Sequence, residues 1–287
     1  MASNTATVAT PPSLRRRRAR LSMATLVSLI ILGFWTVVAV LGPLILPHDP
    51  TDFISDDSFA AAGGAWLGTD HMGRDLASRL LGGARVTLGM SVLAALIAHL
   101  LGGSLGVLGA IRGGVIDAVA SRVVDVLLSL PKIVVGLVVV AVLGPSLTVL
   151  VAMAGIVYAC GVFRIARALA ADVLVIDFVR AARARGEGTA WIMFGEVLPN
   201  IIRPLAADFA IRVSFAILFI SSLGFLGLGV QPPLADWGAL VHDNISGLAA
   251  GSFAPIWPAL AIASVTISLN LLVDSWTRGR DGGSAHR

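Results

Sequence analysis

Six long apolar runs dominate this sequence and restrict the folds open to it. They cover residues 22–46, 84–110, 118–143, 147–169, 204–229 and 255–276. A helix needs about 20 apolar residues to cross the hydrocarbon core of a bilayer. Backbone polar groups in lipid must be satisfied within the segment, and the runs show no period-two alternation, so helices are favoured over strands. The sequence therefore predicts an all-α membrane protein with six transmembrane helices.

The composition agrees with a membrane location. Charged residues make up 13% of the chain and the mean hydropathy is +0.89, whereas soluble domains carry about 25% charged residues. A net charge of +4 could indicate nucleic-acid binding, but the arginines cluster at the ends of the apolar runs, so no nucleic-acid partner is predicted. Cys160 is the only cysteine, which excludes an internal disulfide and any cysteine-based metal site.

The distribution of arginines predicts the orientation, because short cytoplasmic loops carry an excess of basic residues. Arginines occupy the N-terminal segment, the loops near 111–117 and 170–203, and the C-terminal tail. The segment between the first two runs is acidic instead, with Asp49, Asp52, Asp56, Asp57, Asp70 and Asp75. Both termini are therefore predicted to be cytoplasmic.

Four segments follow from this pattern. Residues 1–20 are predicted to form a disordered, basic cytoplasmic tail, and residues 21–80 an N-terminal anchor helix with an external loop. Residues 81–277 form a core of five helices, and 278–287 a cytoplasmic tail. The first apolar run is too long for a cleaved secretory signal, and no small-residue cleavage site follows it.

The polar insertion at 177–200, DFVRAARARGEGTAWIMFGEVLPN, interrupts the cytoplasmic side of the core. Asp177 is a predicted N-cap, and Gly186 and Gly188 are expected to end the first helix. A second short helix is predicted at 189–198. Two such helices at right angles would form a projection for a partner's groove; alternatively, the insertion is a solvated basic loop that only enforces topology.

This insertion resembles the cytoplasmic loop of ABC importer permeases, which reads Glu-Ala-Ala, three residues, Gly, nine residues, Ile, one residue, Leu-Pro. The matching positions are Ala181, Ala182, Gly186, Leu198 and Pro199. Two positions differ: Arg180 replaces the glutamate, and Glu196 replaces the isoleucine. The resemblance implies that the five matched residues belong to a coupling helix docked in a cleft of an ATPase subunit.

Four further blocks extend the resemblance over nearly all of residues 21–276. They lie at 66–90, 113–131, 221–240 and 270–276, and are similar to dipeptide, oligopeptide and nickel importer permeases. Within that group the chain resembles the subunit with a short external N-terminal loop, which pairs with a second, different permease.

The resemblance implies a type I ABC importer permease fold in a bacterial plasma or inner membrane. The implied partners are a second permease subunit, ATP-binding subunits and an extracytoplasmic solute-binding protein. Transport would proceed by alternating access, with peptides as substrates or, alternatively, nickel or another small solute. The chain lacks a G-x-x-x-x-G-K-[ST] phosphate loop. It is therefore not expected to be an enzyme or to hold a cofactor, and ATP and Mg²⁺ belong to partner subunits.

Lys132 follows Pro131 inside the third apolar run. A charged group at membrane depth costs about 2.5–3.5 kcal/mol or more and usually faces the bundle interior or a water-filled path. One hypothesis is that Lys132 lines the translocation route and attracts a peptide carboxylate. The alternative is a lysine that extends to the interface or pairs with an aspartate on a neighbouring helix.

The remaining polar residues of the runs are interpreted as structural. His99 stands alone, so a metal site there is not predicted, and glycines at 102, 103, 106 and 109 indicate close helix packing. Asp208 and Arg212 lie one turn apart and are predicted to pair. A second charge cluster is expected at the inner end of the third run, formed by Asp117, Arg122 and Asp125.

The loop at 230–254 contains Trp237, with Trp257 close by; both are assigned to the aromatic belt at the membrane interface. Together with the 48–80 loop it is a candidate docking face for a solute-binding protein. The rival classes are a secondary transporter, which predicts inverted repeats and broken midplane helices, and a membrane-embedded enzyme. No clear repeat or catalytic constellation is present in the sequence.

Overall fold

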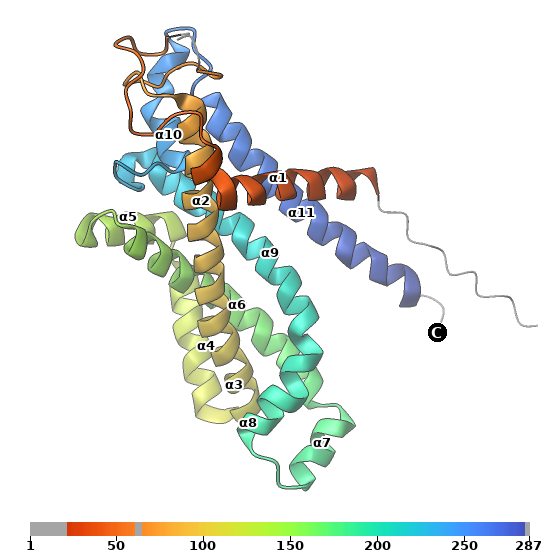
Figure 1. Cartoon of the computed structure of the whole chain (residues 1–287). Coiled ribbons are helices and arrows are strands. Elements are labelled where there is room, and N and C mark those ends of the chain that lie inside the picture. The colour runs from red at the N-terminus through yellow and green to blue at the C-terminus, as the bar shows by residue number, and fades with distance from the viewer. Residues whose placement is uncertain (1–21, 61–64, 285–287) are drawn as a thin grey trace, which may run out of the picture.

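The computed structural model describes residues 22–60 and 65–284, and within them the protein is helical, with isolated bridges in place of β-strands (Figure 1). The long segments, in chain order, are α1 (Met23–Ile45), α2 (Leu76–Ala98), α3 (Ser104–Arg112), α4 (Gly114–Ser129), α5 (Lys132–Leu143), α6 (Leu147–Leu174), α9 (Leu198–Leu223) and α11 (Ile256–Ser284). The short helices are α7 (Asp177–Ala184), α8 (Thr189–Trp191) and α10 (Trp237–Asp243), followed by the 3₁₀ turn η4 (Ile245–Leu248). Of three π-helical segments, η1 (His99–Gly103) and η2 (Ile192–Val197) join helices, and η3 (Gly224–Leu228) extends the end of α9.

Five continuous helical segments of the described chain are long and apolar enough to cross a membrane. They are Met23–Gly42, Leu76–Arg112, Leu147–Leu174, Thr189–Leu228 and Ile256–Thr277. The pair α4 and α5 makes a sixth span if it crosses as one unit. The prediction of an all-α membrane protein is therefore confirmed. The predicted N-terminal tail at 1–20 lies outside the described residues, and α11 continues beyond the predicted end of the last span at residue 276.

The third predicted span, 118–143, is not one straight helix. α4 ends at Ser129 and α5 begins at Lys132, and their axes differ by 87°. Leu130 and Pro131 between them are extended, as expected because proline disfavours helical geometry in the residue before it. The prediction of a continuous helix was wrong because it rested on the apolar character of the run and did not allow for the break that Pro131 imposes.

Close packing of α2, η1 and α3 against α6 forms the centre of the molecule. A Cβ atom built on Gly102 would lie 2.1 Å from the carbonyl oxygen of Ala159, and one on Gly106 would lie 2.5 Å from that of Phe163. The helix backbones can therefore approach only because these residues lack side chains. The prediction of glycine-mediated packing is confirmed at both positions, whereas Gly103 has room for a side chain.

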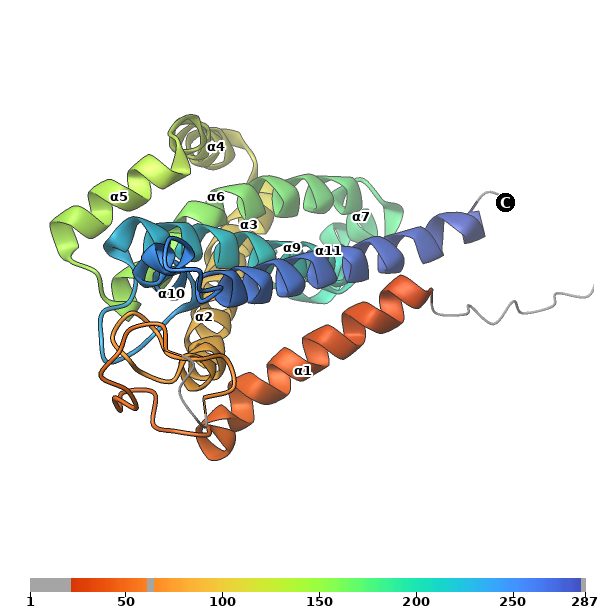
Figure 2. The same ribbon diagram turned by 90° about the horizontal axis from the view of Figure 1, so that it is seen from above.

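α1 packs beside α11 on one side of the molecule, and α4 and α5 lie on the other (Figure 2). Trp35 of α1 meets Trp237 of α10 edge to face, with ring centroids 4.8 Å apart. Trp237 is fully buried, and its indole N–H donates to the Leu80 carbonyl over 3.0 Å. The assignment of Trp237 to an interfacial aromatic belt was wrong because tertiary packing satisfies its N–H inside the protein; Trp257 is partly exposed.

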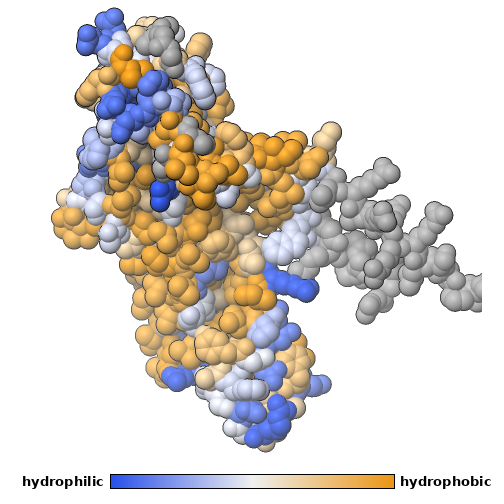
Figure 3. All heavy atoms as spheres, viewed as in Figure 1, coloured by the Kyte–Doolittle hydropathy of each residue, from blue (hydrophilic) through white to orange (hydrophobic). Residues whose placement is uncertain are grey.

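Polar side chains gather at the two ends of the molecule, and a largely apolar surface lies between them (Figure 3). We call the end formed by residues 46–60, 65–75 and 229–255 the loop end, and the end formed by residues 175–199 the α7 end. They lie at the top and bottom of Figure 1. An apolar band between two polar ends is the arrangement that a lipid bilayer requires.

Candidate functional site: the α7 end and the Lys132 cavity

α7 is a short helix that leaves the end of α6 and turns back at Gly186 (Figure 1). Its first residue is Asp177, and the extended residue before it is Ile176, which makes no side-chain cap. The prediction that Asp177 is the N-cap is therefore wrong, because Asp177 is already the first residue of the helix. Gly186 has a φ of +85°, the left-handed conformation that ends helices and that glycine adopts without steric cost. The predicted break at Gly186 is confirmed.

The second part of the insertion is not a separate short helix. α8, η2 and α9 follow one another without a break through residues 189–223, and η3 continues them as far as a kink at Gly227, where φ is +80°. The predicted stop at Pro199 is wrong because Pro199 lies in the first turn of α9, directly after π-helical residues. In a regular α-helix the proline ring clashes with the carbonyl group four residues earlier. The wider π-helical turn before Pro199 moves that carbonyl group away, so the helix continues.

One face of α7 packs against the start of this long helix. Val179 and Ala182 are fully buried, and Val179 belongs to an apolar cluster with Ile192 and Val197 of η2. Of the five residues that match the importer motif, Ala182 is therefore structural. Leu198 is half-buried and packs on the same cluster, while the other three are exposed: Ala181, Gly186 and Pro199.

The two residues that differ from the motif are held by weak ion pairs. Arg180 lies 3.6 Å from the carboxylate of Asp177, and both side chains are largely exposed. The carboxylate of Glu196 lies 3.9 Å from Arg185, which also approaches Glu187 at 3.8 Å. Arg185 thus offsets the negative charge that Glu196 introduces at the isoleucine position.

The α7 end also exposes large apolar side chains among its arginines. Among them, Phe194 is 63% exposed and Trp191 53% exposed. The others are Val175, Ile176 and Phe178. Several exposed apolar side chains among charged residues are typical of a protein interaction surface. We call these five residues the α7 apolar patch.

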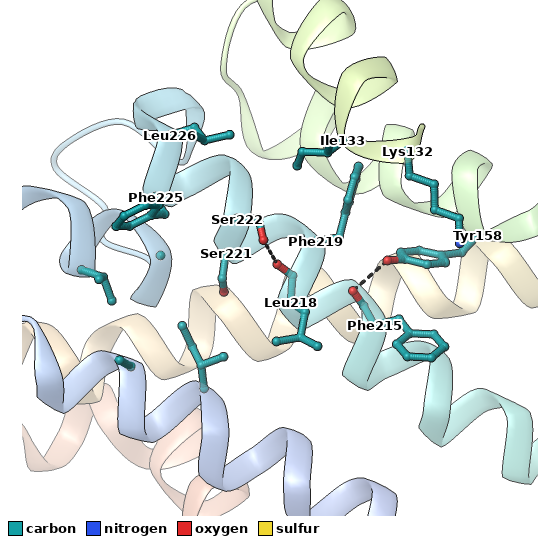
Figure 4. A pocket seen from close by; sticks show the side chains of 14 residues that line it. Lys132, Ile133, Tyr158, Phe215, Leu218, Phe219, Ser221, Ser222, Phe225 and Leu226 are labelled. Carbon is teal, nitrogen blue, oxygen red and sulfur yellow. Dashed lines mark hydrogen bonds between the residues drawn. The ribbon is translucent and has the colours of Figure 1, made fainter. Parts of the chain in front are cut away.

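The second candidate site is an open cavity of about 700 Å³ between α5, α6, α9, α10 and α11. Figure 4 shows Lys132 at one end of it, with its ammonium group over the ring of Tyr158. The Tyr158 hydroxyl donates to the Phe215 carbonyl over 2.9 Å. The structure therefore places Lys132 on a cavity wall, and no described carboxylate lies within ion-pair distance of it. Whether substrate passes here stays a prediction.

A buried charge network lies beside this cavity. Arg212 Nη2 lies 3.2 Å from Asp208 Oδ1, as predicted, and His99 Nε2 lies 3.3 Å from Asp208 Oδ2. His99 Nδ1 lies 2.9 Å from the Ala95 carbonyl, so this nitrogen carries a proton. The interpretation of His99 as a lone side chain was wrong because its partner comes from another helix; only its position at membrane depth could have suggested a buried partner.

The predicted cluster of Asp117, Arg122 and Asp125 is also corrected. Asp117 accepts two hydrogen bonds from Arg167 of α6, from Nε and Nη2, each 2.5 Å long. This bidentate pair fastens α4 to α6, whereas Arg122 on the same helix takes no part in it. A pairing between residues 50 positions apart cannot be seen in one sequence.

At the loop end, Asp70 organises the connection before α2. It is fully buried and accepts hydrogen bonds from the Arg74 side chain, the Arg79 side chain and two backbone N–H groups. Burial raises the pKa of Asp70, but the bonds from Arg74, Arg79 and Met72 outweigh it, so the pKa lies below the usual value. Asp70 therefore stays ionised between two buried arginines.

The two loops of this end pack on each other. The N–H of His71 donates to the side-chain oxygen of Asn244 over 2.9 Å, and Phe59 lies against Gly247. The acidic residues at 49–57 stay on the surface, where Asp49, Asp52, Asp56 and Asp57 are exposed. Asp70 and Asp75, the other two acidic residues predicted for this external segment, are buried.

Residues 101–279 match the family model described as "Binding-protein-dependent transport system inner membrane component". The chain belongs to this family. It is a multi-pass inner-membrane permease of a transport system, and the matched residues include both the α7 end and Lys132. The break between α4 and α5 is also a feature that secondary transporters would show, but the family match assigns the chain to binding-protein-dependent transport.

Full-length relatives agree with this assignment. The permease is 32% identical over 254 residues to the glutathione transport system permease protein GsiD of Pectobacterium atrosepticum, covering 86% of this chain and 80% of the relative. It is 31% identical to the dipeptide transport system permease protein DppC of Haemophilus influenzae, covering 87% of both chains. It is 34% identical to the di/tripeptide permease DppC of Pseudomonas aeruginosa, covering 82% and 80%.

Proposed function

We propose that this permease is one of two membrane subunits of an ATP-driven importer of di- or oligopeptides. The relatives named above are permeases of dipeptide, di/tripeptide and glutathione systems, and glutathione is itself a small peptide. ATP hydrolysis is assigned to separate ATP-binding subunits. A second, different permease would complete the translocation path.

The observation that carries the proposal is the projection of α7 from the bundle. α7 ends in a glycine turn beside the α7 apolar patch, and the long helix 189–228 runs from this point directly into the membrane-spanning part. A movement imposed on the α7 end is therefore carried along one continuous helix to Phe215 and Phe219 at the cavity. We propose that the ATP-binding subunit contacts Ala181, Gly186 and the α7 apolar patch. Ala182, Leu198 and Pro199 hold these contact residues in position.

The loop end is proposed to receive the solute-binding protein. Its two loops form one packed unit through His71, Asn244 and Phe59. The exposed acidic residues of 49–57 give it a negative rim, and complementary charge speeds the encounter of two proteins. The cytoplasmic placement of both termini remains part of this proposal.

The test uses two glycines of the same turn. Gly186 and Gly188 both have free space around the position of a Cβ atom, but only Gly186 has a positive φ, whereas Gly188 has a φ of −78°. Valine strongly disfavours a positive φ. Gly186→Val should abolish most of the ATPase activity that the loaded binding protein stimulates in the reconstituted transporter, and Gly188→Val should retain it.

Membrane insertion and assembly are measured alongside by co-purification of the ATP-binding subunits. Equal stimulated ATPase activity in both valine variants would contradict a coupling role for this turn. Failure of the wild-type permease to co-purify with any ATP-binding subunit, under conditions in which it is folded, would contradict the proposed function itself.

A further inference from the structure

Lys132 is the only lysine in the 287-residue sequence. Apart from the histidines, every other basic residue is an arginine. Its neighbours Tyr158 and Phe215 lie well inside the membrane-spanning helices α6 and α9. A lysine at that depth is costly, and such residues normally serve a pathway or a bound ligand. Its ammonium group is a flexible point charge with three donors.

The surroundings of Lys132 leave this charge without a carboxylate. Its ammonium group lies 5.0 Å from the centre of the Tyr158 ring, a cation–π contact that holds the side chain in place. Asp208 of α9 is already approached by other groups: Arg212 Nη2 lies 3.2 Å from one of its oxygens, and His99 Nε2 lies 3.3 Å from the other. Lys132 therefore retains the capacity to bind an anion.

The rest of the cavity offers an apolar wall with one free hydroxyl. Phe215, Phe219 and Phe225 line it, and Figure 4 shows Phe219 between the serines and Lys132. Ser221 also lines the cavity; it is 5% exposed, and its hydroxyl has no hydrogen-bond partner among the described residues. An unpartnered buried hydroxyl is uncommon, and a rotation of the Ser221 side chain would bring this one to a ligand in the cavity.

We propose that this cavity is a subsite for short peptides in which Lys132 binds the C-terminal carboxylate. The phenylalanine wall then takes apolar side chains of the peptide, and the Ser221 hydroxyl binds a peptide group. This inference rests on the proposed function and adds a selectivity to it: the membrane subunit itself favours a free carboxylate. The volume of about 700 Å³ fits a ligand of di- or tripeptide size.

The first test is uptake by the assembled transporter in proteoliposomes with its binding protein. The two substrates are a leucine-ending tripeptide and the same tripeptide with a C-terminal amide. Lys132→Met should lower uptake of the free acid about tenfold relative to the amide, the loss expected for one hydrogen bond to a charged group. Lys132→Arg should keep most of the preference.

Arg164→Met is the matched control. Arg164 is an exposed cation of α6 that does not line this cavity, so its removal changes the charge of a spanning helix without touching the subsite. Its acid-to-amide ratio should equal that of the wild type. A Lys132→Met variant whose two uptake rates fall equally, or stay unchanged, overturns the subsite while leaving ATP-driven peptide import intact.

The second test does not need the binding protein. An amine-specific reagent can label only Lys132 and the N-terminal amine of this chain, and the two are separated by peptide mapping. The free tripeptide should slow labelling of Lys132 in the assembled transporter, and its amide should not. Equal protection by both peptides, or a Lys132 already shielded by an acidic residue of the second subunit without peptide, overturns the proposal.

Wild-type ATPase activity distinguishes a failure of the subsite from a failure of the proposed peptide import. If the loaded binding protein stimulates ATPase activity but Lys132→Met has no selective effect, only the subsite is wrong. If no peptide stimulates the wild-type transporter, the proposed peptide import fails, and the subsite fails with it.

Discussion

The two ends of this permease are held together by different forces. At the loop end, Asp70 is fully buried between Arg74 and Arg79, and Asp236 is fully buried under the N–H groups of Val230 and Ala239. At the α7 end, the ion pairs are exposed and long, and the apolar contact is confined to one face of a short helix. The loop end is therefore fixed by charge in a dry environment, and the α7 end is fixed by a small apolar contact.

This difference suits the proposed roles. A surface that receives a solute-binding protein keeps its shape if buried and fully paired charges hold its loops rigidly. A segment that transmits movement must be displaced at a low cost in free energy, and regions with few buried contacts open most readily. Substitutions at either end can contradict this distinction.

The largest effect is expected at Asp70. Asp70→Asn keeps the size of the side chain but leaves two buried arginines without their anion, which typically costs 3–5 kcal/mol when one partner of a buried pair is removed, so about 3–5 kcal/mol is expected here. Thermal unfolding in detergent, followed by tryptophan fluorescence, measures it. The control is Asp56→Asn, an exposed acid of the same loop, which should change stability by less than about 0.5 kcal/mol. Similar effects for the two would show that the loop end is not fixed by buried charge.

The same variant has a predictable pH dependence. The pKa of Asp70 is lowered in the folded protein, so its contribution to stability is complete above the unfolded value of 3.8 and is lost as the pH falls through the still lower folded pKa. The difference in unfolding temperature between wild type and Asp70→Asn should stay constant from pH 8 to about pH 5 and shrink below about pH 4. A difference that vanishes already near pH 6 would assign the effect to a histidine instead.

A part of this fold could be predicted from sequence because hydrophobicity and backbone preference act locally. Apolar length identified five continuous spans, and the glycines at 102 and 106 indicated close packing. The left-handed turn at Gly186 and the pair of Asp208 with Arg212 follow from neighbours in the chain. Each of these depends on residues within about one helical turn.

The features that were missed depend on contacts between distant segments. Asp117 meets Arg167, and His99 meets Asp208, only after α6 and α9 have packed. Trp237 was assigned to the membrane interface, although its N–H is satisfied inside the protein by Leu80. One sequence carries no record of which helices pack together, so these partners could not be assigned.

A smaller effect is expected at Val179, the buried residue of α7. Val179→Ala removes two methyl groups from the cluster with Ile192 and Val197 and should cost about 2 kcal/mol. Because α7 is held to the bundle by this small contact, cleavage by trypsin after Arg183 should rise more than tenfold while the global unfolding temperature hardly changes. The control, Phe178→Ala, alters a partly exposed residue of the same helix and should leave the cleavage rate near that of wild type. A matching fall in global stability for Val179→Ala would mean that the α7 end unfolds together with the bundle.

The smallest effect is expected from the charge that departs from the importer motif. Arg185 is 56% exposed and lies 3.9 Å from Glu196, and exposed pairs of this kind contribute about 0–1 kcal/mol. A double-mutant cycle of Arg185→Ala and Glu196→Gln, measured by trypsin resistance of α7, should give a coupling energy below about 0.5 kcal/mol. Glu196 then occupies the isoleucine position of the motif with little effect on stability, and α7 remains held by Val179 and Ala182. A coupling energy above about 1.5 kcal/mol would show that this end, like the loop end, is fixed by charge, and the distinction between the two ends would no longer hold.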